Sequence, residues 1–353
     1  MKKTFKRTLV SMSVAAITMG SFAANAYTIG ETNDSKVEVY GVVSISAVDY
    51  GTKAKAKDGS TKDQGWVLEN ETRVGFRAAQ AMTDSVEAFV QMESGWMLDD
   101  GAKLGNRDTF AGIRGDEWGA VRFGRMLTPM YELVDWPYSA SNMGTTFDRG
   151  WRAGERFHFD RKSQHVRYDS AQIADMLNFS LSYGNGSENT SDSNFVGGKV
   201  SVTPVDMLTL HAAFELTNDT EFDDDLIGDT DNYFVGFEFR PIANLSFAGA
   251  YKTGEFDSNK KGTGDYDERE IDAYSLQANY FMGNTNFRLG YASQDGKTDG
   301  VKDEFLKRET LTGEVGYSFN AVYTFLRVAQ HSDARGSKYG EDTMIRIGTE
   351  WYF

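Results

Sequence analysis

Apolar and polar residues alternate with a period of two along most of the chain. In residues 37–47, alternate positions are apolar or Gly, and Glu38, Ser44 and Ser46 lie between them. Because successive side chains of a strand point to opposite faces, this pattern predicts a strand with one apolar and one largely polar face. The same split recurs in later segments, among them 84–97, 177–184 and 308–319. Helical periodicity is nearly absent, so an all-β fold is expected.

The alternation predicts sixteen strands. They lie near residues 37–49, 66–79, 84–97, 107–115, 119–126, 163–170, 177–184, 196–203, 207–217, 231–240, 244–255, 268–281, 284–294, 308–319, 322–332 and 341–353. The connections between them alternate in length. Short turns such as 204–206 and 282–283 alternate with long segments rich in polar residues, such as 52–65, 218–230, 256–267 and 295–307. Hairpins that are short at one end and long at the other indicate an antiparallel transmembrane barrel with short periplasmic turns and long external loops.

Aromatic residues near the ends of the predicted strands favour the same fold, because Tyr, Trp and Phe suit the two membrane interfaces. The alternative is a soluble β-sandwich, which has no need of tight turns on one side only. The last strand adds a further signal, since Ile347, Trp351 and the terminal Phe353 share one face. This ending resembles the C-terminal targeting strand of bacterial outer-membrane barrels, and Phe353 is the expected membrane-targeting residue.

The N-terminal residues are expected to direct export. A basic stretch that includes Lys2 and Arg7 precedes an apolar run at 8–19, and Ala24-Asn25-Ala26 fits a cleavage site, so residues 1–26 predict a signal peptide. Residues 27–353 would then form a single barrel domain. No later stretch reaches the roughly 20 apolar residues of a membrane-spanning helix, which excludes a helical membrane bundle.

Composition narrows the function further. The chain has 353 residues, no Cys and a formal net charge of -15, so disulfide scaffolds, thiolate metal sites and thiol catalysis are excluded. A strongly negative chain is also a poor nucleic-acid binder, because phosphate contacts need Lys or Arg. If the lumen shares this acidity, a modest preference for cations over anions is expected.

One connection is much longer than the others. Residues 126–162, between the fifth and sixth predicted strands, form roughly 35 residues without strand character, and connections of this length are usually functional. A barrel of sixteen strands leaves an aqueous lumen, so this segment can fold inward and narrow it.

Several motifs, in order along the chain, match a known family. They are the residues at 72–77 (TRVGFR), 106–113 (NRDTFAGI), 118–125 (WGAVRFGR) and 166–170 (VRYDS), and the terminal 351–353 (WYF). Their order and spacing extend across nearly the whole predicted mature chain, which resembles a general bacterial porin of the Gram-negative outer membrane. The resemblance implies a homotrimer of sixteen-stranded barrels, each constricted by its third loop. It also implies contact with lipopolysaccharide and outer-membrane lipids.

In that family, arginines on the barrel wall face acidic residues on the loop. The matching wall residues here would be Arg73, Arg107 and Arg161. A transverse field across a narrow aqueous gap selects solutes by charge and diameter. The loop departs from the family at 138–146, which contains no carboxylate, so the field is expected to be weaker or displaced. The candidate constriction acids are Glu132, Asp135 and Asp148, and Glu155 is a further acid of this loop.

The same loop is rich in aromatic residues, of which Trp136, Tyr138 and Trp151 are candidate sugar contacts. Aromatic faces suit the apolar faces of sugar rings, which favours a sugar-selective porin resembling the chitooligosaccharide porins. The alternative is that these rings only pack the loop against the wall.

Other chemistry has little support in the sequence. The acidic run at 219–231 does not match the EF-hand pattern, and a solvated outer loop is the simpler interpretation. The four His residues include no i, i+4 pair, and no nucleophile motif stands in a suitable context. We therefore expect no cofactor, no metal and no catalytic residues. The predicted function is passive diffusion of small hydrophilic solutes through an outer-membrane porin. A saccharide-selective porin is the alternative of the same class, and a barrel receptor or outer-membrane enzyme is the alternative of another class.

Overall fold

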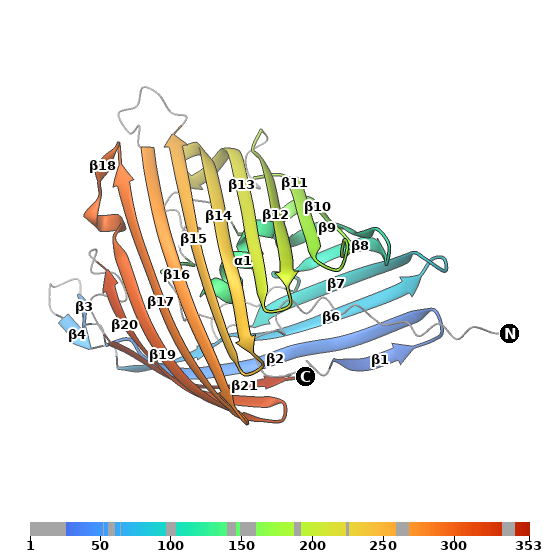
Figure 1. Ribbon diagram of the computed structural model, residues 1–353, viewed down its shortest axis with the longest axis horizontal. Coiled ribbons are helices and arrows are strands. Elements are labelled where there is room, and N and C mark those ends of the chain that lie inside the picture. Colours follow the sequence, from blue (N-terminus) through green and yellow to red (C-terminus); the bar gives the residue numbers. More distant parts are fainter. Residues whose placement is uncertain are drawn as a thin grey trace.

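The computed structural model describes residues 26–51, 53–55, 61–63, 65–96, 104–139, 146–148, 160–186, 192–223, 226–258, 268–333 and 343–353. Residues 1–25 of the expected signal peptide, together with Trp151 and Glu155, lie outside the described residues. Almost every described element is a β-strand, which confirms the predicted all-β class (Figure 1). Among these elements, no helix is long and apolar enough to cross a membrane.

Sixteen antiparallel strands form a closed ring, as predicted. They are β2 (Ser35–Asp49), β5 (Trp66–Asn70) continued by β6 (Thr72–Ala81), β7 (Glu87–Trp96), β8 (Thr109–Gly115), β9 (Gly119–Leu127), β10 (Arg161–Asp169), β11 (Leu177–Gly184), β12 (Asn194–Val205), β13 (Leu208–Asp223), β14 (Leu226–Ile242), β15 (Leu245–Ser258), β16 (Glu268–Met282), β17 (Thr285–Thr298), β19 (Arg308–Phe319), β20 (Val322–Asp333) and β21 (Thr343–Tyr352). Each strand pairs with the next, and β21 pairs with β2 to close the ring.

The described residues also form smaller elements outside the sixteen strands of the ring. They are β1 (Tyr27–Glu31), β3 (Lys53–Lys55), β4 (Thr61–Asp63), β18 (Val301–Lys302), the helix α1 (Pro129–Leu133), the π-helical turn η2 (Val134–Ser139) and the 3-10 turn η3 (Glu304–Leu306). The final residue helps to close the barrel, because the backbone N–H of Phe353 donates to the Gly41 carbonyl at 3.0 Å and the Phe353 carbonyl accepts from the Gly41 N–H at 2.8 Å. β1 pairs with the part of β2 that β21 does not reach. The targeting role of Phe353 stays a prediction.

All four long predicted loops contain strand residues. β3 and β4 lie within 52–65, β15 reaches residue 258, and β17 continues past residue 295. The largest difference is at 218–230, into which both β13 and β14 continue, so these predicted boundaries were wrong. The Thr217 and Thr230 hydroxyls lie 2.7 Å apart and link β13 to β14 at the positions where the sequence predicted that these strands end. Where a hairpin rises beyond the apolar band of the barrel, both of its faces can be polar. The apolar alternation then fades although the ladder of hydrogen bonds continues.

The two faces of the barrel differ in the way that a membrane requires. On β16, Tyr274 and Leu276 are 53% and 57% exposed on the outer face, whereas their neighbours Ser275 and Gln277 are buried on the inner face. β14 and β17 also expose apolar side chains on the outer face and bury polar side chains such as Asn232 and Arg288 on the inner face. An apolar outer band and a polar interior match a barrel whose outer surface contacts lipid and whose lumen contacts water.

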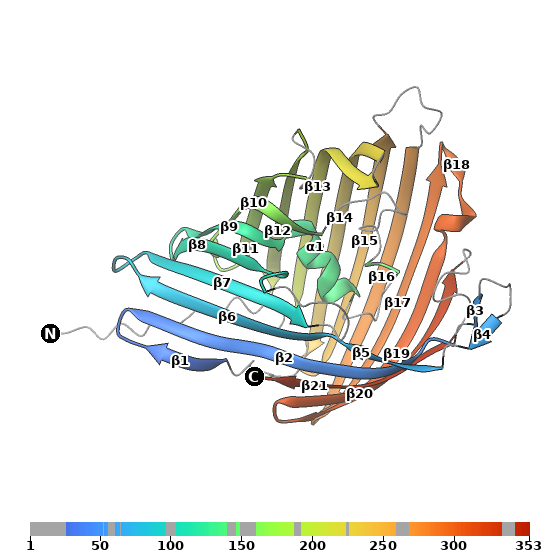
Figure 2. The same ribbon diagram turned by 180° about the vertical axis from the view of Figure 1, so that it is seen from behind.

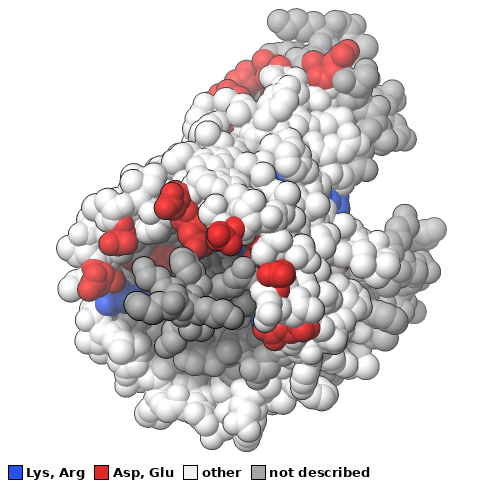
Figure 3. All heavy atoms as spheres, turned by 90° about the vertical axis from the view of Figure 1, so that its right-hand side faces the viewer, with Lys and Arg blue, Asp and Glu red and all other residues white. Residues whose placement is uncertain are grey.

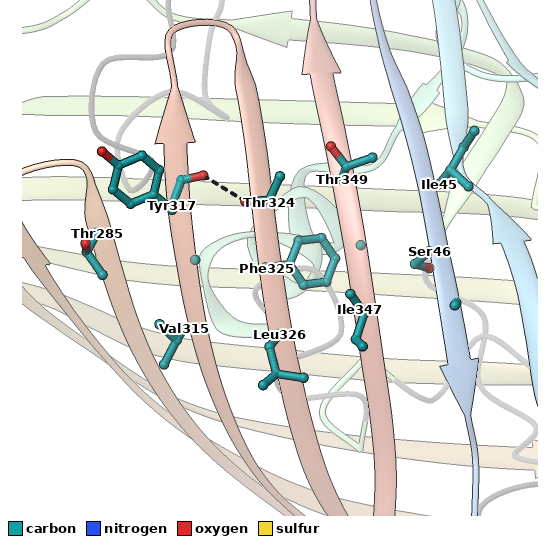
Figure 4. Close-up of a pocket in the computed structure, with 13 residues that line it drawn as sticks. Ile45, Ser46, Thr285, Val315, Tyr317, Thr324, Phe325, Leu326, Ile347 and Thr349 are labelled. Atoms are coloured by element: carbon teal, nitrogen blue, oxygen red, sulfur yellow. Dashed lines mark hydrogen bonds between the residues drawn. The ribbon is translucent and has the colours of Figure 1, made fainter.

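A shallow hollow lies on the outer face of this wall. It has a volume of about 680 Å³ and lies over β2, β17, β19, β20 and β21. Val315, Leu326 and Ile347 line it, and each is about half exposed (Figure 4). Because these side chains belong to the apolar outer band, the hollow faces the hydrocarbon and is not part of the lumen.

Candidate functional site

The described residues 128–139 and 146–148, between β9 and β10, lie inside the ring. This segment leaves and rejoins the wall on paired strands, since Met126 is opposite Lys162. Thr128 caps the helix α1, accepting a hydrogen bond from the Tyr131 backbone N–H at 3.3 Å, and Pro129 occupies the first helical turn. Figure 2 shows α1 within the curve of the barrel strands. Beyond α1, Trp136 has extended backbone angles (φ -148°, ψ 132°), which interrupt the helical path.

An apolar cluster anchors this segment to one wall. Tyr138 and Phe147 are completely buried and pack against Phe234 of β14, with ring centroids 5.1 Å and 6.2 Å from that residue. The Tyr138 carbonyl accepts hydrogen bonds from Ser275 Oγ at 2.5 Å and Gln277 Nε2 at 3.1 Å. These five residues come from the segment itself, β14 and β16, so this part of the segment packs on the lumen face of the wall.

A glycine in the wall, Gly236 of β14, leaves the space that the Tyr138 ring occupies. A Cβ atom on Gly236 would lie 2.7 Å from the Tyr138 hydroxyl, so only Gly leaves space for the ring. Further along, Thr146 and Thr310 bring their hydroxyls within 2.7 Å and tie the segment to β19. Burial of two large rings, roughly 2 kcal/mol each, supplies the main attraction that holds the segment to the wall.

A charged cluster anchors the other end of the segment. The Glu132 carboxylate accepts hydrogen bonds from Arg167 of β10, at 2.6 Å, and from Lys199 of β12. Burial acts to raise the pKa of Glu132, but Arg167 and Lys199 outweigh it and hold that pKa well below its usual range. Asp169 also forms an ion pair with Arg167, in which the Asp169 Oδ1 atom lies 2.8 Å from Arg167 Nη2. Glu132 is therefore a negatively charged tie between α1 and the wall.

The three predicted wall arginines lie around the lumen side of the same segment. Arg73 is exposed on β6, Arg107 pairs with Glu93 at 2.6 Å, and Arg161 pairs with Asp108. All three interact electrostatically with Asp135. Burial raises the pKa of Asp135, and the arginines offset part of that rise. One loop carboxylate thus lies within electrostatic range of all three arginines.

The other predicted site residues that the structure describes, Asp148, Trp136 and Tyr138, differ in their burial and in their neighbours. Asp148 and Asp135 both act electrostatically on Tyr131, which lies on α1. Trp136 is half-buried, and the guanidinium carbon of Arg288 lies 5.7 Å from its ring centroid. Tyr138, in contrast, is fully buried in the anchor, so its ring does not face the lumen.

Sequence reasoning missed a second group of arginines. Arg288, Arg327 and Arg346 lie in one row across β17, β20 and β21, and Glu314 of β19, in the same row, pairs with Arg288 and Arg327. Each Arg stands between two residues of the apolar outer face, and that pattern could have found them. Within the side chains that the structure describes, no group of three or more acidic or His residues could hold a metal ion.

Acidic residues also gather at one mouth of the barrel. The short turns after β1, β6, β8 and β10 lie on the right in Figure 1, which is the side that Figure 3 shows. Their exposed carboxylates include Asp34, Asp84, Asp116 and Asp175. In Figure 3, red Asp and Glu residues stand along the rim, and few Lys or Arg are visible on this face.

Comparison with known proteins decides the family. The sequence profile of the Gram-negative porin family matches residues 13–348. The chain belongs to this porin family. It is an outer-membrane porin, and such a barrel forms a water-filled channel for passive diffusion of small hydrophilic solutes and ions.

Individual relatives of this porin agree with that assignment. The chitoporin of Vibrio furnissii is 35% identical over 390 aligned positions that cover 100% of each chain. Among solved structures, OmpT of Vibrio cholerae in its trimer form has a TM-score of 0.70 at 16% identity, covering 91% of this chain and 100% of OmpT. OmpF of Salmonella typhi has a TM-score of 0.66 at 17% identity, covering 91% and 98%. The two solved structures share the fold of this porin.

Proposed function

We propose that this porin is selective for saccharides and takes up oligosaccharides of N-acetylglucosamine. The observation that carries the proposal is the half-buried Trp136, held on the lumen segment with one ring face over Arg288. An aromatic face of this kind binds the apolar face of a sugar ring, as other π-faces bind flat apolar partners. The full-length similarity to a chitoporin supports the same substrate class.

The charged groups supply the rest of the proposed selectivity. In this proposal Arg73, Arg107 and Arg161 form the basic side of the constriction, and Asp135, with which all three interact, forms the acidic side together with Asp148. A field across this gap orients water and the hydroxyl and amide dipoles of a neutral sugar. Glu132 fixes the backbone that carries Asp135 and Trp136, so its contribution to the constriction is to set the position of the segment.

We further propose that the protein is exported after removal of residues 1–26 and assembles as a homotrimer among lipopolysaccharide and outer-membrane lipids. The trimer form of OmpT, which has the same fold, supports the assembly. The apolar outer band, including the half-exposed Leu326 and Ile347, supports the contact with lipid. The acidic rim supports a modest preference for cations.

Liposome swelling tests the substrate class. Vesicles that contain the purified protein should swell faster in the trimer of N-acetylglucosamine than in maltotriose, although the first sugar is heavier. Rates that fall only with molecular mass would instead indicate a general diffusion porin. Vesicles without protein provide the control.

Acidification should reduce cation selectivity through Asp135. Because the pKa of Asp135 is raised, its negative charge is present above that pKa and is lost as the pH falls, at a higher pH than for an ordinary Asp. The reversal potential in a salt gradient, measured from neutral to mildly acidic pH, should therefore shift toward anions. Asp135→Asn should show the shifted potential already at neutral pH and a weaker pH dependence. An unchanged pH profile in that variant would assign the titration to another group.

A further inference from the structure

Trp136 and Asp135, which are consecutive in the lumen segment, interact with different walls of the barrel. Asp135 interacts with arginines of the β6–β10 side, whereas the Trp136 ring meets Arg288 of β17. The extended backbone of Trp136 allows these consecutive side chains to point to opposite walls, as they do in a strand. The segment therefore crosses the lumen at these two residues.

Arg288 is itself held firmly by the wall. Its Nε donates to Asn279 Oδ1 of β16 at 3.1 Å, and its Nη1 donates to Glu314 Oε1 of β19 at 3.2 Å. The side chain is only 4% exposed. Glu314 is fixed in turn by Arg327, at 2.6 Å, and by the Tyr323 hydroxyl, at 2.8 Å. A guanidinium with three neighbouring strands behind it is a rigid platform for an aromatic ring.

We propose that Arg288 is a positioning residue for sugar binding, which acts by fixing the ring plane of Trp136. This inference rests on the proposed saccharide selectivity. One face of the Trp136 ring is covered by the guanidinium, so a sugar ring stacks on the opposite face. The plane of that sugar ring follows the orientation that β16, β17 and β19 impose on Arg288. Without the guanidinium, the Trp136 side chain regains rotamer freedom that sugar binding must remove again.

Single-channel recording tests the assignment through the residence time of a hexamer of N-acetylglucosamine. Arg288→Gln should shorten the residence time by about three- to tenfold, the range that a partly buried cation–π contact supports. Arg288→Lys keeps the cation and should restore part of this loss. Arg346→Gln is the matched control, because Arg346 lies in the same row, is only 7% exposed and pairs with Glu69. The control should change ion selectivity about as much as Arg288→Gln and leave sugar residence within about twofold.

A double-mutant cycle separates positioning from a general effect of charge. In a Trp136→Ala background, Arg288→Gln should have no further effect on sugar residence, because its action passes through the ring. An equal loss in both backgrounds, or an equal loss in the Arg346→Gln control, overturns the proposal.

A fluorescence readout keeps the test independent of sugar binding. The Trp136 signal is obtained as the difference between chains with and without Trp136→Phe, since the chain has six Trp residues. Acrylamide should quench this difference signal more strongly after Arg288→Gln and not after Arg346→Gln. If the wild-type channel shows no sugar block but the quenching changes as expected, the saccharide proposal fails while the positioning of Trp136 stands. Unchanged quenching overturns the positioning role itself.

Discussion

Replacing Trp136 with Ala shortens the residence of an N-acetylglucosamine hexamer in the channel by about tenfold or more. The change removes the half-buried aromatic face of the lumen segment, and loss of such an anchor costs about 2 kcal/mol of binding free energy. Ion conductance should stay within about twofold, because Trp136 carries no charge and the arginines that face Asp135 are untouched. Single-channel recordings in planar bilayers give both quantities from the same traces.

Trp136→Phe is the matched control for that experiment. Phe keeps a flat ring over Arg288, so it should retain most of the sugar residence time. If Trp136→Ala leaves the sugar block unchanged, the aromatic residues of the segment are structural only, and selectivity comes from the charged groups.

Replacing Tyr138 with Ala loosens the lumen segment and raises conductance by more than about twofold, with added current noise. The Tyr138 ring is completely buried against Phe147 and Phe234, and removal of a buried aromatic side chain costs about 3–5 kcal/mol. That loss falls on the contact between segment and wall, because the barrel itself is closed by backbone pairing. Sugar residence should fall at the same time, since the position of Trp136 depends on the anchor.

Tyr138→Phe separates packing from hydrogen bonding. The Tyr138 hydroxyl is buried and has no hydrogen-bond partner among the residues that the structure describes, and an unsatisfied buried polar group costs about 1–3 kcal/mol. Phe should therefore leave conductance and noise unchanged, or make the current steadier. Quiet channels of normal conductance in the Ala variant would show that the Glu132 cluster holds the segment without the apolar anchor.

The fold could be predicted from the sequence because the strands carry their information locally. Within the membrane, one face of each strand meets lipid and the other the lumen, so apolar residues recur with a period of two. The rule failed at 218–230, where the hairpin of β13 and β14 continues beyond the apolar band. A strand that is polar on both faces cannot be distinguished from a polar loop by alternation alone.

The candidate site was harder to predict, because its contacts join distant parts of the chain. Arg73, Arg107 and Arg161 came from the resemblance to a family, and no local pattern marked them as facing Asp135. An aromatic residue in a loop can point into the lumen or into the wall, and nothing near Tyr138 in the sequence decides between them. The alternation around Arg288 could have placed it on the lumen face, but its contacts could not be predicted, since its partners lie on β16, β19 and the lumen segment.

Single-channel conductance of the detergent-purified protein, with a hexamer of N-acetylglucosamine added on one side, tests the central claim most directly. A saccharide-selective trimeric porin should insert with three equal conductance steps and show brief, sugar-dependent blockades at micromolar concentrations, with no such blockades from maltohexaose. Open current that neither sugar blocks would contradict the saccharide selectivity. Absence of any conductance would contradict the channel itself and favour a barrel receptor or an outer-membrane enzyme.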